Sequence, residues 1–154
     1  MLARARWIAL LLPLALMAGA LGSQYLGGLS PCEMCLWQRW PHYAAIVAAA
    51  LAILLRRAAL RLPLTMLAGL LILTSGGIGV FHAGAEYHWW NGPQHCTGLA
   101  RGTGRDLMRA ILAQPLIRCD VPQWTLFGIS LAGFNALFSI AGGLTVLALC
   151  LKRR

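Results

Sequence analysis

The stretch LTMLAGLLILTSGGIGVFHA, residues 64–83, runs for 20 positions without a charged side chain. A helix needs roughly 20 apolar residues to cross the hydrocarbon layer of a bilayer, so this stretch has the length of a membrane span. A helix also satisfies its own backbone hydrogen bonds within one segment, as lipid requires. We therefore expect residues 64–83 to form a membrane-spanning helix.

Three further apolar stretches surround it, at about residues 7–26, 36–55 and 126–149. Across its 154 residues the chain is 59% hydrophobic and only 11% charged, with a mean hydropathy of +0.69. A soluble domain of this size needs more charge than that to cover its surface. The composition therefore predicts an all-α membrane protein, a single domain over residues 1–154 that forms a bundle of four transmembrane helices.

The basic residues divide unequally between the two sides of such a bundle. One side would hold 8 of the 13 Lys and Arg residues and no acidic residue: Arg4, Arg6, Arg56, Arg57, Arg61, Lys152, Arg153 and Arg154. The other side would hold 5 basic residues and all 4 acidic ones, so the net charges are +8 and +1. Because cytoplasmic loops carry the excess of Lys and Arg, we expect cytoplasmic termini and periplasmic loops at about 27–31 and 84–123. The net charge of +9 then reports topology and does not indicate a nucleic-acid partner.

The N-terminal stretch has a second interpretation, a secretory signal peptide. Its basic start, its apolar centre and Ala18-Gly19-Ala20 match the pattern of a cleavable signal. Cleavage would leave three spans with the same outward loops. The apolar run continues beyond Ala20, which favours an uncleaved first helix.

Small residues recur at four-residue spacing in the third and fourth stretches: Ser75, Gly79 and Ala83, then Gly128, Ala132 and Ala136. Such positions let helices approach closely in lipid, although small residues are also ordinary in membrane helices. Both interpretations predict a compact bundle.

The long loop contains an amphipathic segment, RDLMRAILAQPLI, residues 105–117. Its apolar residues share one helical face: Leu107, Met108, Ile111 and Leu112. Arg105 and Arg109 lie off that face. We expect a short interfacial helix that lies on membrane lipid and ends at Pro115.

Two cysteines mark the start of the second stretch, in PCEMCLWQRWPHY, residues 31–43. Cys32, Cys35, Arg39 and His42 follow a 3-4-3 spacing, so the four share one helical face. Free amides and the helix dipole at a helix start stabilise a thiolate there. Arg39 could lower the pKa of the Cys35 thiol and bind a carbonyl or anionic oxygen of a ligand, or it could extend to the outer headgroups.

Histidine and glutamate side chains are further candidates for a ligand site beside these cysteines. His42 lies deeper on the same helix and is more typical of a packed, hydrogen-bonded residue than of a catalyst. Glu86 and His88, just past the third stretch, could approach from a neighbouring helix. Solvation at the membrane interface is the plainer account of Glu86, His88 and also His82.

A second pair, Cys96 and Cys119, falls in the long outward loop. Two pairs facing an oxidising compartment favour electron relay by thiol–disulfide exchange. Two structural disulfides are the alternative, but they do not explain a Cys-X-X-Cys beside an arginine. A zinc site is disfavoured because 22 residues separate Cys96 from Cys119 and exposed thiols would oxidise, so we expect no metal. Cys150 is expected to be a small buried hydrophobe.

The pattern resembles the bacterial disulfide bond formation protein B (DsbB) family over nearly the whole chain. The resemblance rests on PCEMCLWQRWPHY, HAGAEYHWWNGPQHCTG and RCDVPQWTLFGISLAGFNALFS. It implies an inner-membrane oxidoreductase that reoxidises a periplasmic thioredoxin-fold dithiol oxidase (DsbA-like). Electrons would pass on to ubiquinone or menaquinone.

The resemblance also implies a role for each cysteine. The partner's thiolate would attack Cys96; Cys119 would leave and then attack the Cys32–Cys35 disulfide at Cys32. Cys35 would become the thiolate that faces the quinone, and Arg39 would hold a quinone oxygen. Some family members have a histidine directly after the glutamate, where this chain has Tyr87 before His88. A DsbB-like paralogue with one dedicated partner, or a non-catalytic membrane protein with structural disulfides, stays open as an alternative.

Overall fold

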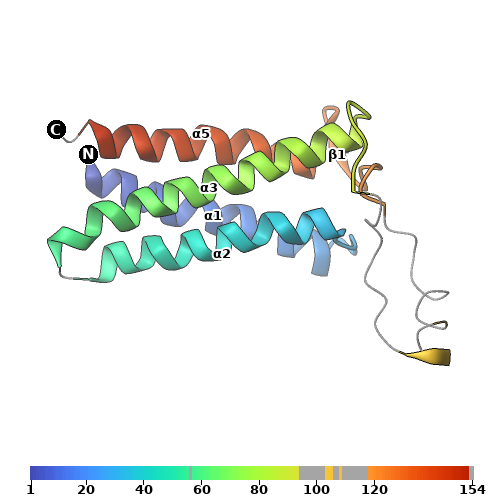
Figure 1. The fold of residues 1–154 in the computed structure, drawn as a ribbon, viewed down its shortest axis with the longest axis horizontal. Coiled ribbons are helices and arrows are strands. Elements are labelled where there is room, and N and C mark those ends of the chain that lie inside the picture. The colour runs from blue at the N-terminus through green and yellow to red at the C-terminus, as the bar shows by residue number, and fades with distance from the viewer. Residues whose placement is uncertain (56, 94–102, 106–107, 109–117, 153–154) are drawn as a thin grey trace.

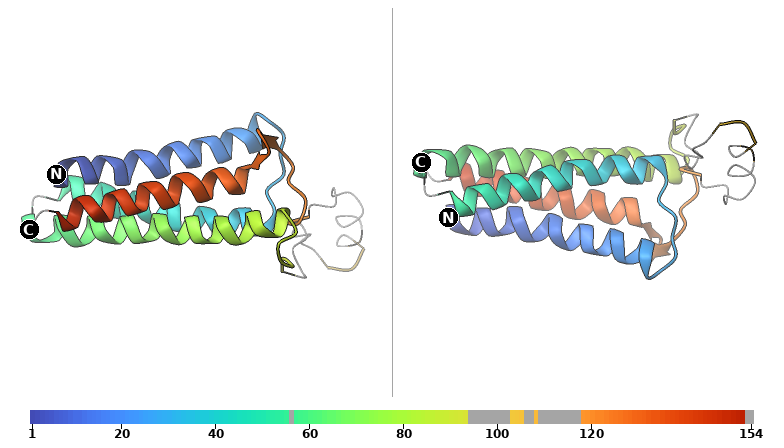
Figure 2. Two further views of the ribbon diagram at one scale, coloured as in Figure 1. Left: turned by 90° about the horizontal axis from the view of Figure 1, so that it is seen from above. Right: turned by 90° about the horizontal axis from the view of Figure 1, so that it is seen from below.

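The structure is a computed structural model that describes residues 1–55, 57–93, 103–105, 108 and 118–152. Long helices that lie side by side dominate it (Figures 1 and 2): α1 (Leu2–Tyr25), α2 (Glu33–Leu54), α3 (Ala58–Glu86) and α5 (Leu131–Leu151). Helix α3 packs along both α2 and α5, and α1 covers the other side of α2 and α5. The start of α1 and the end of α5 lie at the same end of the bundle (Figure 1).

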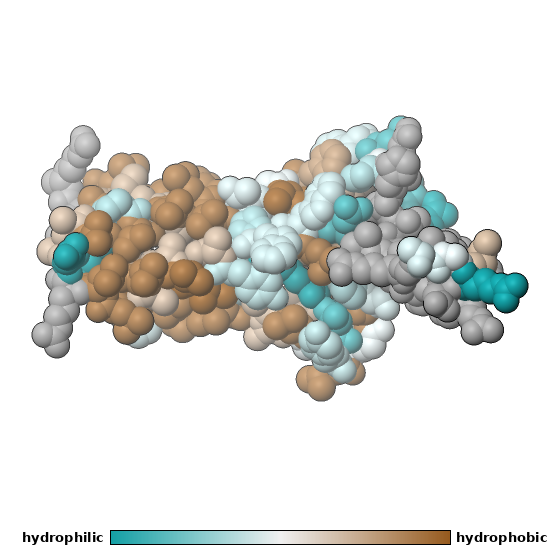
Figure 3. Space-filling model, turned by 60° about the horizontal axis from the view of Figure 1, so that its bottom comes forward, coloured by the Kyte–Doolittle hydropathy of each residue, from teal (hydrophilic) through white to brown (hydrophobic). Residues whose placement is uncertain are grey.

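Three of these helices, α1, α3 and α5, are long and apolar enough to cross a membrane. The prediction of a helical membrane protein is confirmed to that extent. Helix α2 has 22 residues but is not among the three, since its first half carries Glu33, Gln38, Arg39 and His42. A membrane crossing by α2 therefore stays a prediction. Figure 3 shows apolar side chains along the bundle and hydrophilic ones gathered toward the end opposite the termini.

The segment before α5 corrects two expectations. The fourth helix was expected from about residue 126, but α5 begins at Leu131. The residues before it form an antiparallel ladder of two short strands, β1 (Thr125–Leu126) and β2 (Ile129–Ser130), so the described fold is not entirely helical. Phe127 and Gly128 make the turn, both in the left-handed region at φ 52° and 77°. Ser130 then caps α5, because its Oγ accepts a hydrogen bond from Gly133 N at 3.1 Å.

Small side chains set the close approach of the helices. A Cβ added to Gly79 on α3 would lie 3.0 Å from Ala136 N and 3.1 Å from Ala132 O on α5. The approach expected of small residues is thus found where Gly79 faces Ala132 and Ala136, whereas Gly128 lies in the turn before α5 and not in the helix. Nearer the termini lies the alanine core, a buried apolar cluster: Ala5, Ala9, Ala45, Ala48, Ala49, Ala68, Ile72, Val146 and Cys150. Cys150 is buried there, as expected.

The predicted interfacial helix over 105–117 lies mostly outside the described residues, as residues 106–107 and 109–117 are not described. That prediction is not tested.

Candidate functional site

The first turn of α2 holds the Cys-X-X-Cys pair. Cys32 is the residue that caps the helix, and its Sγ accepts a hydrogen bond from Cys35 N at 3.2 Å. The Cys32 thiol also donates to Cys35 Sγ at 2.9 Å, and both cysteines are free. This hydrogen bond, followed by burial, raises the pKa of the Cys32 thiol. Of the two sulfurs, Cys32 therefore keeps its proton more strongly, and negative charge falls preferentially on Cys35.

Cys119 comes to the same place from the segment before β1. Its Sγ, the Sγ of Cys32 and a ring nitrogen of His82 all lie within 4.8 Å of one another. Cys119 is itself disulfide-bonded. Gln123 holds this segment against the loop before α2, because its Nε2 donates to Ser30 O at 2.6 Å. Cys96, the other predicted cysteine of the loop, lies outside the described residues.

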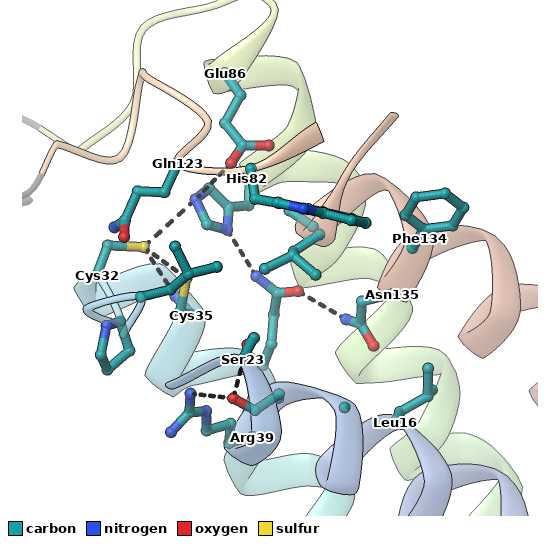
Figure 4. Close-up of a pocket in the computed structure, with 18 of the residues that line it drawn as sticks. Leu16, Ser23, Cys32, Cys35, Arg39, His82, Glu86, Gln123, Phe134 and Asn135 are labelled. Atoms are coloured by element: carbon teal, nitrogen blue, oxygen red, sulfur yellow. Dashed lines mark hydrogen bonds and ion pairs between the residues drawn. The ribbon is translucent and has the colours of Figure 1, made fainter. Parts of the chain in front are cut away.

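His82 on α3 is a cavity-lining residue that the sequence analysis set aside as solvated at the interface. It is 2% exposed, so the expectation that it is solvated at the interface is wrong. Its Nε2 lies 3.5 Å from Cys32 Sγ and 3.7 Å from Glu86 Oε1, while its Nδ1 lies 2.7 Å from Gln38 Nε2 (Figure 4). The i, i+4 spacing of His82 and Glu86 was the one available signal, since it places both on one face of α3.

A polar network, defined here as Gln38, His42, Ser75, His82, Asn135 and Ser139, continues from His82 into the bundle. Asn135 Nδ2 donates to Gln38 Oε1 at 2.7 Å, and Asn135 Oδ1 lies 2.9 Å from His42 Nε2. Ser75 Oγ donates to Gln38 O at 2.8 Å and lies 2.9 Å from His42 Nε2. The network joins α2, α3 and α5, and buried polar groups that are fully paired hold their side chains in one arrangement.

Arg39 points toward the end of α1. Its Nη1 donates to Gln24 Oε1 at 2.6 Å and its Nη2 to Ala20 O at 3.4 Å. A cation placed at the last turns of a helix also interacts favourably with the helix dipole. The guanidinium is therefore held between two helices at the side of the cavity described next.

A cavity of about 220 Å³ lies between the first turns of α2 and the ends of the other helices (Figure 4). The predicted residues that line it are Cys32, Cys35, Arg39, His42 and Glu86, joined by Gln38, His82 and Asn135. The expectation that Cys32, Cys35, Arg39 and His42 share one face is thus met. His88 does not line the cavity: it is exposed, at φ 59°, in the turn that follows α3.

Two polar atoms on the cavity wall have no hydrogen-bond partner within the described residues. They are His42 Nδ1 and Glu86 Oε2, and both are buried. Unpaired buried polar atoms are costly, so hydrogen bonding is incomplete at these two residues of the cavity lining.

The cluster of Cys32, His82 and Cys119 also has the donor atoms of a metal site. Zinc binds cysteine as a thiolate, and a sulfur in a disulfide cannot serve in that form. Because Cys119 is disulfide-bonded, the arrangement fits sulfur-to-sulfur exchange better than metal binding.

Comparison with known proteins agrees with the chemistry of this site. The family described as DsbB, disulfide bond formation protein DsbB, matches residues 3–149 of the chain. A protein of Polaromonas sp. (strain JS666 / ATCC BAA-500), named disulfide bond formation protein B, is 33% identical over 147 residues, which cover 88% of this chain and 82% of that protein. The protein of the same name from Polaromonas naphthalenivorans (strain CJ2) is 31% identical over 147 residues, covering 88% and 83%. No solved structure matches the chain.

Proposed function

The chain belongs to the DsbB family of disulfide bond formation proteins, and from that premise we propose that it oxidises a thioredoxin-fold dithiol protein in the bacterial periplasm and passes the electrons to a membrane quinone. The family membership and the three apolar helices make it a membrane protein of disulfide bond formation. Its charge distribution supports an inner-membrane location with both termini in the cytoplasm and the cysteine loops in the periplasm.

The observation that carries the proposal is the proximity of Cys119 Sγ to Cys32 Sγ, within 4.8 Å. A thiolate attacks a disulfide only where the sulfurs can meet, and these two cysteines are 87 positions apart in the chain. In the proposed cycle the partner's thiolate attacks Cys96, and Cys119 leaves as a thiolate. Cys119 then attacks Cys32, the Cys32–Cys35 bond breaks, and Cys35 leaves as a thiolate.

The cavity beside Cys35 fits a quinone head group. Ubiquinone and menaquinone both carry two ring oxygens, and when bound they accept two electrons and two protons. The Arg39 guanidinium is a charged donor for one ring oxygen. Apolar side chains from α1 and α5, including Leu16, Met17 and Phe134, line the rest of the wall.

His42 lines that cavity, and its hydrogen bonds determine which ring nitrogen carries the proton. Ser75 Oγ gives its one proton to Gln38 O, so it can only accept from His42 Nε2. The ring proton of neutral His42 is thereby assigned to Nε2, and the unpaired Nδ1 is left as an acceptor. Glu86 lines the same wall, whereas His88 is left out of the proposed site because it lies away from it.

The test is a coupled assay with purified protein in lipid nanodiscs. A reduced thioredoxin-fold dithiol oxidase and a short-chain ubiquinone analogue are supplied, and thiol loss and quinone absorbance are followed together. We expect parental turnover to consume both, and Cys35→Ser to abolish quinone reduction because the Cys32–Cys35 disulfide can no longer form or break. Cys150→Ala, at the other end of the bundle, is the matched control and should keep parental turnover. Parental quinone reduction by Cys35→Ser would show that the proposed mechanism is wrong.

A further inference from the structure

Two nitrogen atoms lie close to the sulfur of Cys32. Cys35 N donates to it at 3.2 Å from within α2, and His82 Nε2 faces it at 3.5 Å from α3. Cys32 is only 3% exposed, so water does little to stabilise a charge there. A pair of fixed donors around a buried atom is the arrangement that stabilises developing negative charge at low cost in reorganisation.

The hydrogen bonds of Gln38 determine which ring nitrogen of His82 carries the proton. Asn135 Nδ2 donates to Gln38 Oε1, so the amide nitrogen of Gln38 faces His82. That nitrogen donates to His82 Nδ1, which must then be an acceptor. The proton of the neutral ring therefore lies on Nε2, the atom that faces Cys32 Sγ and, at 3.7 Å, Glu86 Oε1.

We propose that His82 is a catalytic hydrogen-bond donor of the thiol–disulfide relay: its Nε2–H stabilises the Cys32 thiolate when the Cys32–Cys119 disulfide is broken. This inference rests on the function proposed above and adds a residue to it that the cysteine pattern does not reveal. Gln38 is then a positioning residue, because it acts on the sulfur only through the ring of His82.

The step balances without an added reactant. The second thiolate of the dithiol partner first attacks the partner's own sulfur in the mixed disulfide, which releases Cys96 as a thiolate. Cys96 then attacks Cys119 Sγ of a Cys32–Cys119 disulfide and forms a new bond to it. The Cys32–Cys119 bond breaks, and its electron pair stays on Cys32 Sγ, which leaves as a thiolate. No electrons enter or leave, and His82 keeps its proton while it donates. The structure has the arrangement that follows this step, with Cys119 disulfide-bonded and Cys32 free.

The experiment measures the reactivity of Cys32 directly, in full-length protein in nanodiscs without quinone or partner. A Cys35→Ser background removes the competing thiol, and methyl methanethiosulfonate labels Cys32 over a range of pH, read by peptide mass spectrometry. The other titratable groups that face Cys32 are Glu86 on α3 and Cys119, which has no thiol proton in a disulfide. The readout is the pH midpoint of labelling and the rate at neutral pH.

His82→Met removes the donor and keeps an unbranched side chain of similar size. We expect it to raise the midpoint by about 1 unit and to slow labelling at neutral pH about tenfold, the range for a hydrogen bond to a charged group. His82→Gln is the matched control, because its amide N–H reaches the position of Nε2 and should keep the midpoint near the parental one. An unchanged midpoint in His82→Met, or an equal shift in both variants, would overturn the proposal.

Gln38→Met is the second test. If His82→Met fails to fold, Gln38→Met tests by itself whether His82 stabilises the Cys32 thiolate. Without the Gln38 amide the ring proton can leave Nε2, so the midpoint should rise in the same direction; an unchanged midpoint contradicts the proposal. Labelling needs neither quinone nor partner. If the midpoint stays unchanged in His82→Met while the parental protein reduces quinone in the coupled assay, only the role of His82 is removed. If the midpoint shifts but the parental protein does not reduce quinone, only the quinone-linked function is removed.

Discussion

Toward the chain termini the helices pack through the alanine core, whereas toward the opposite end they pack through the polar network. The alanine core includes six buried alanines and needs only small apolar volume at each position. The polar network needs particular donors and acceptors, since each buried polar atom without a partner costs free energy. The same bundle is thus specified by size at one end and by chemistry at the other.

The two ends of the bundle also differ in how completely their buried polar atoms are hydrogen-bonded. Of the three buried side-chain polar atoms without a partner in the described part of the chain, two lie on the cavity wall, His42 Nδ1 and Glu86 Oε2. The third is Arg6 Nε, near the chain's N-terminus. Within the described residues the polar network is therefore satisfied except at His42 Nδ1, an atom of a residue that lines the cavity.

The largest expected effect that separates the two ends comes from a pair of arginine substitutions. Arg39→Met should lower kcat/KM for the quinone analogue about 10- to 100-fold, because one charge-assisted hydrogen bond is lost. Arg6→Met is the matched change at the other end, where Arg6 Nη1 donates to Ala52 O at 3.3 Å. It should leave kcat/KM near the parental value. Steady-state quinone reduction measures both, and equal losses would contradict a quinone role for Arg39.

The next effect concerns packing between α3 and α5. Gly79→Ala should lower the free energy of unfolding by about 1–3 kcal/mol, because its Cβ would meet backbone atoms of Ala136 and Ala132 that cannot yield. Gly77→Ala is the control. Gly77 lies two residues earlier on α3, where an added Cβ would have no atom within 4 Å, so this substitution should be neutral or stabilising. Thermal unfolding in detergent measures both. Equal melting temperatures for the two variants would show that this contact is looser than described.

The smallest effect lies outside the bundle, at the exposed ion pair beside Cys119. Arg118 Nε donates to Asp120 Oδ1 at 2.9 Å, and this contact holds the pKa of Asp120 below its usual value. A lowered carboxyl pKa contributes stability above the unfolded pKa, and that stability is lost as the pH falls through the folded pKa. Asp120→Asn should therefore lower the melting temperature at neutral pH by less than about 2 °C, since exposed pairs contribute little. The difference in melting temperature between Asp120→Asn and the parent should vanish in acid, where Asp120 is protonated. A difference that persists in acid would exclude the ion pair as its cause.

Local pattern was enough to predict several features correctly. Uncharged runs of membrane length predicted the helices now seen as α1 and α3, because apolar length is a property of a segment alone. The 3-4-3 spacing placed Cys32, Cys35, Arg39 and His42 on one face, and all four line the cavity. The start of α5 was predicted too early because hydropathy does not distinguish a short hairpin from a helix. Phe127-Gly128 followed by Ser130 held the turn and cap signals for it.

The positions of the helices and the face of α2 that carries the two cysteines follow from the amino-acid order alone, since each depends on neighbours within a few turns. The meeting of Cys32 with Cys119 and the placement of His82 depend on packing between distant segments. Gln38 and His82 are 44 positions apart, and Gln38 and Asn135 are 97 apart. Helical periodicity relates only residues within a few turns of each other, so it does not predict these contacts. The sequence alone also does not distinguish a buried histidine from a solvated one. Only the packed bundle shows that a ring nitrogen of His82 lies 3.5 Å from the sulfur of Cys32.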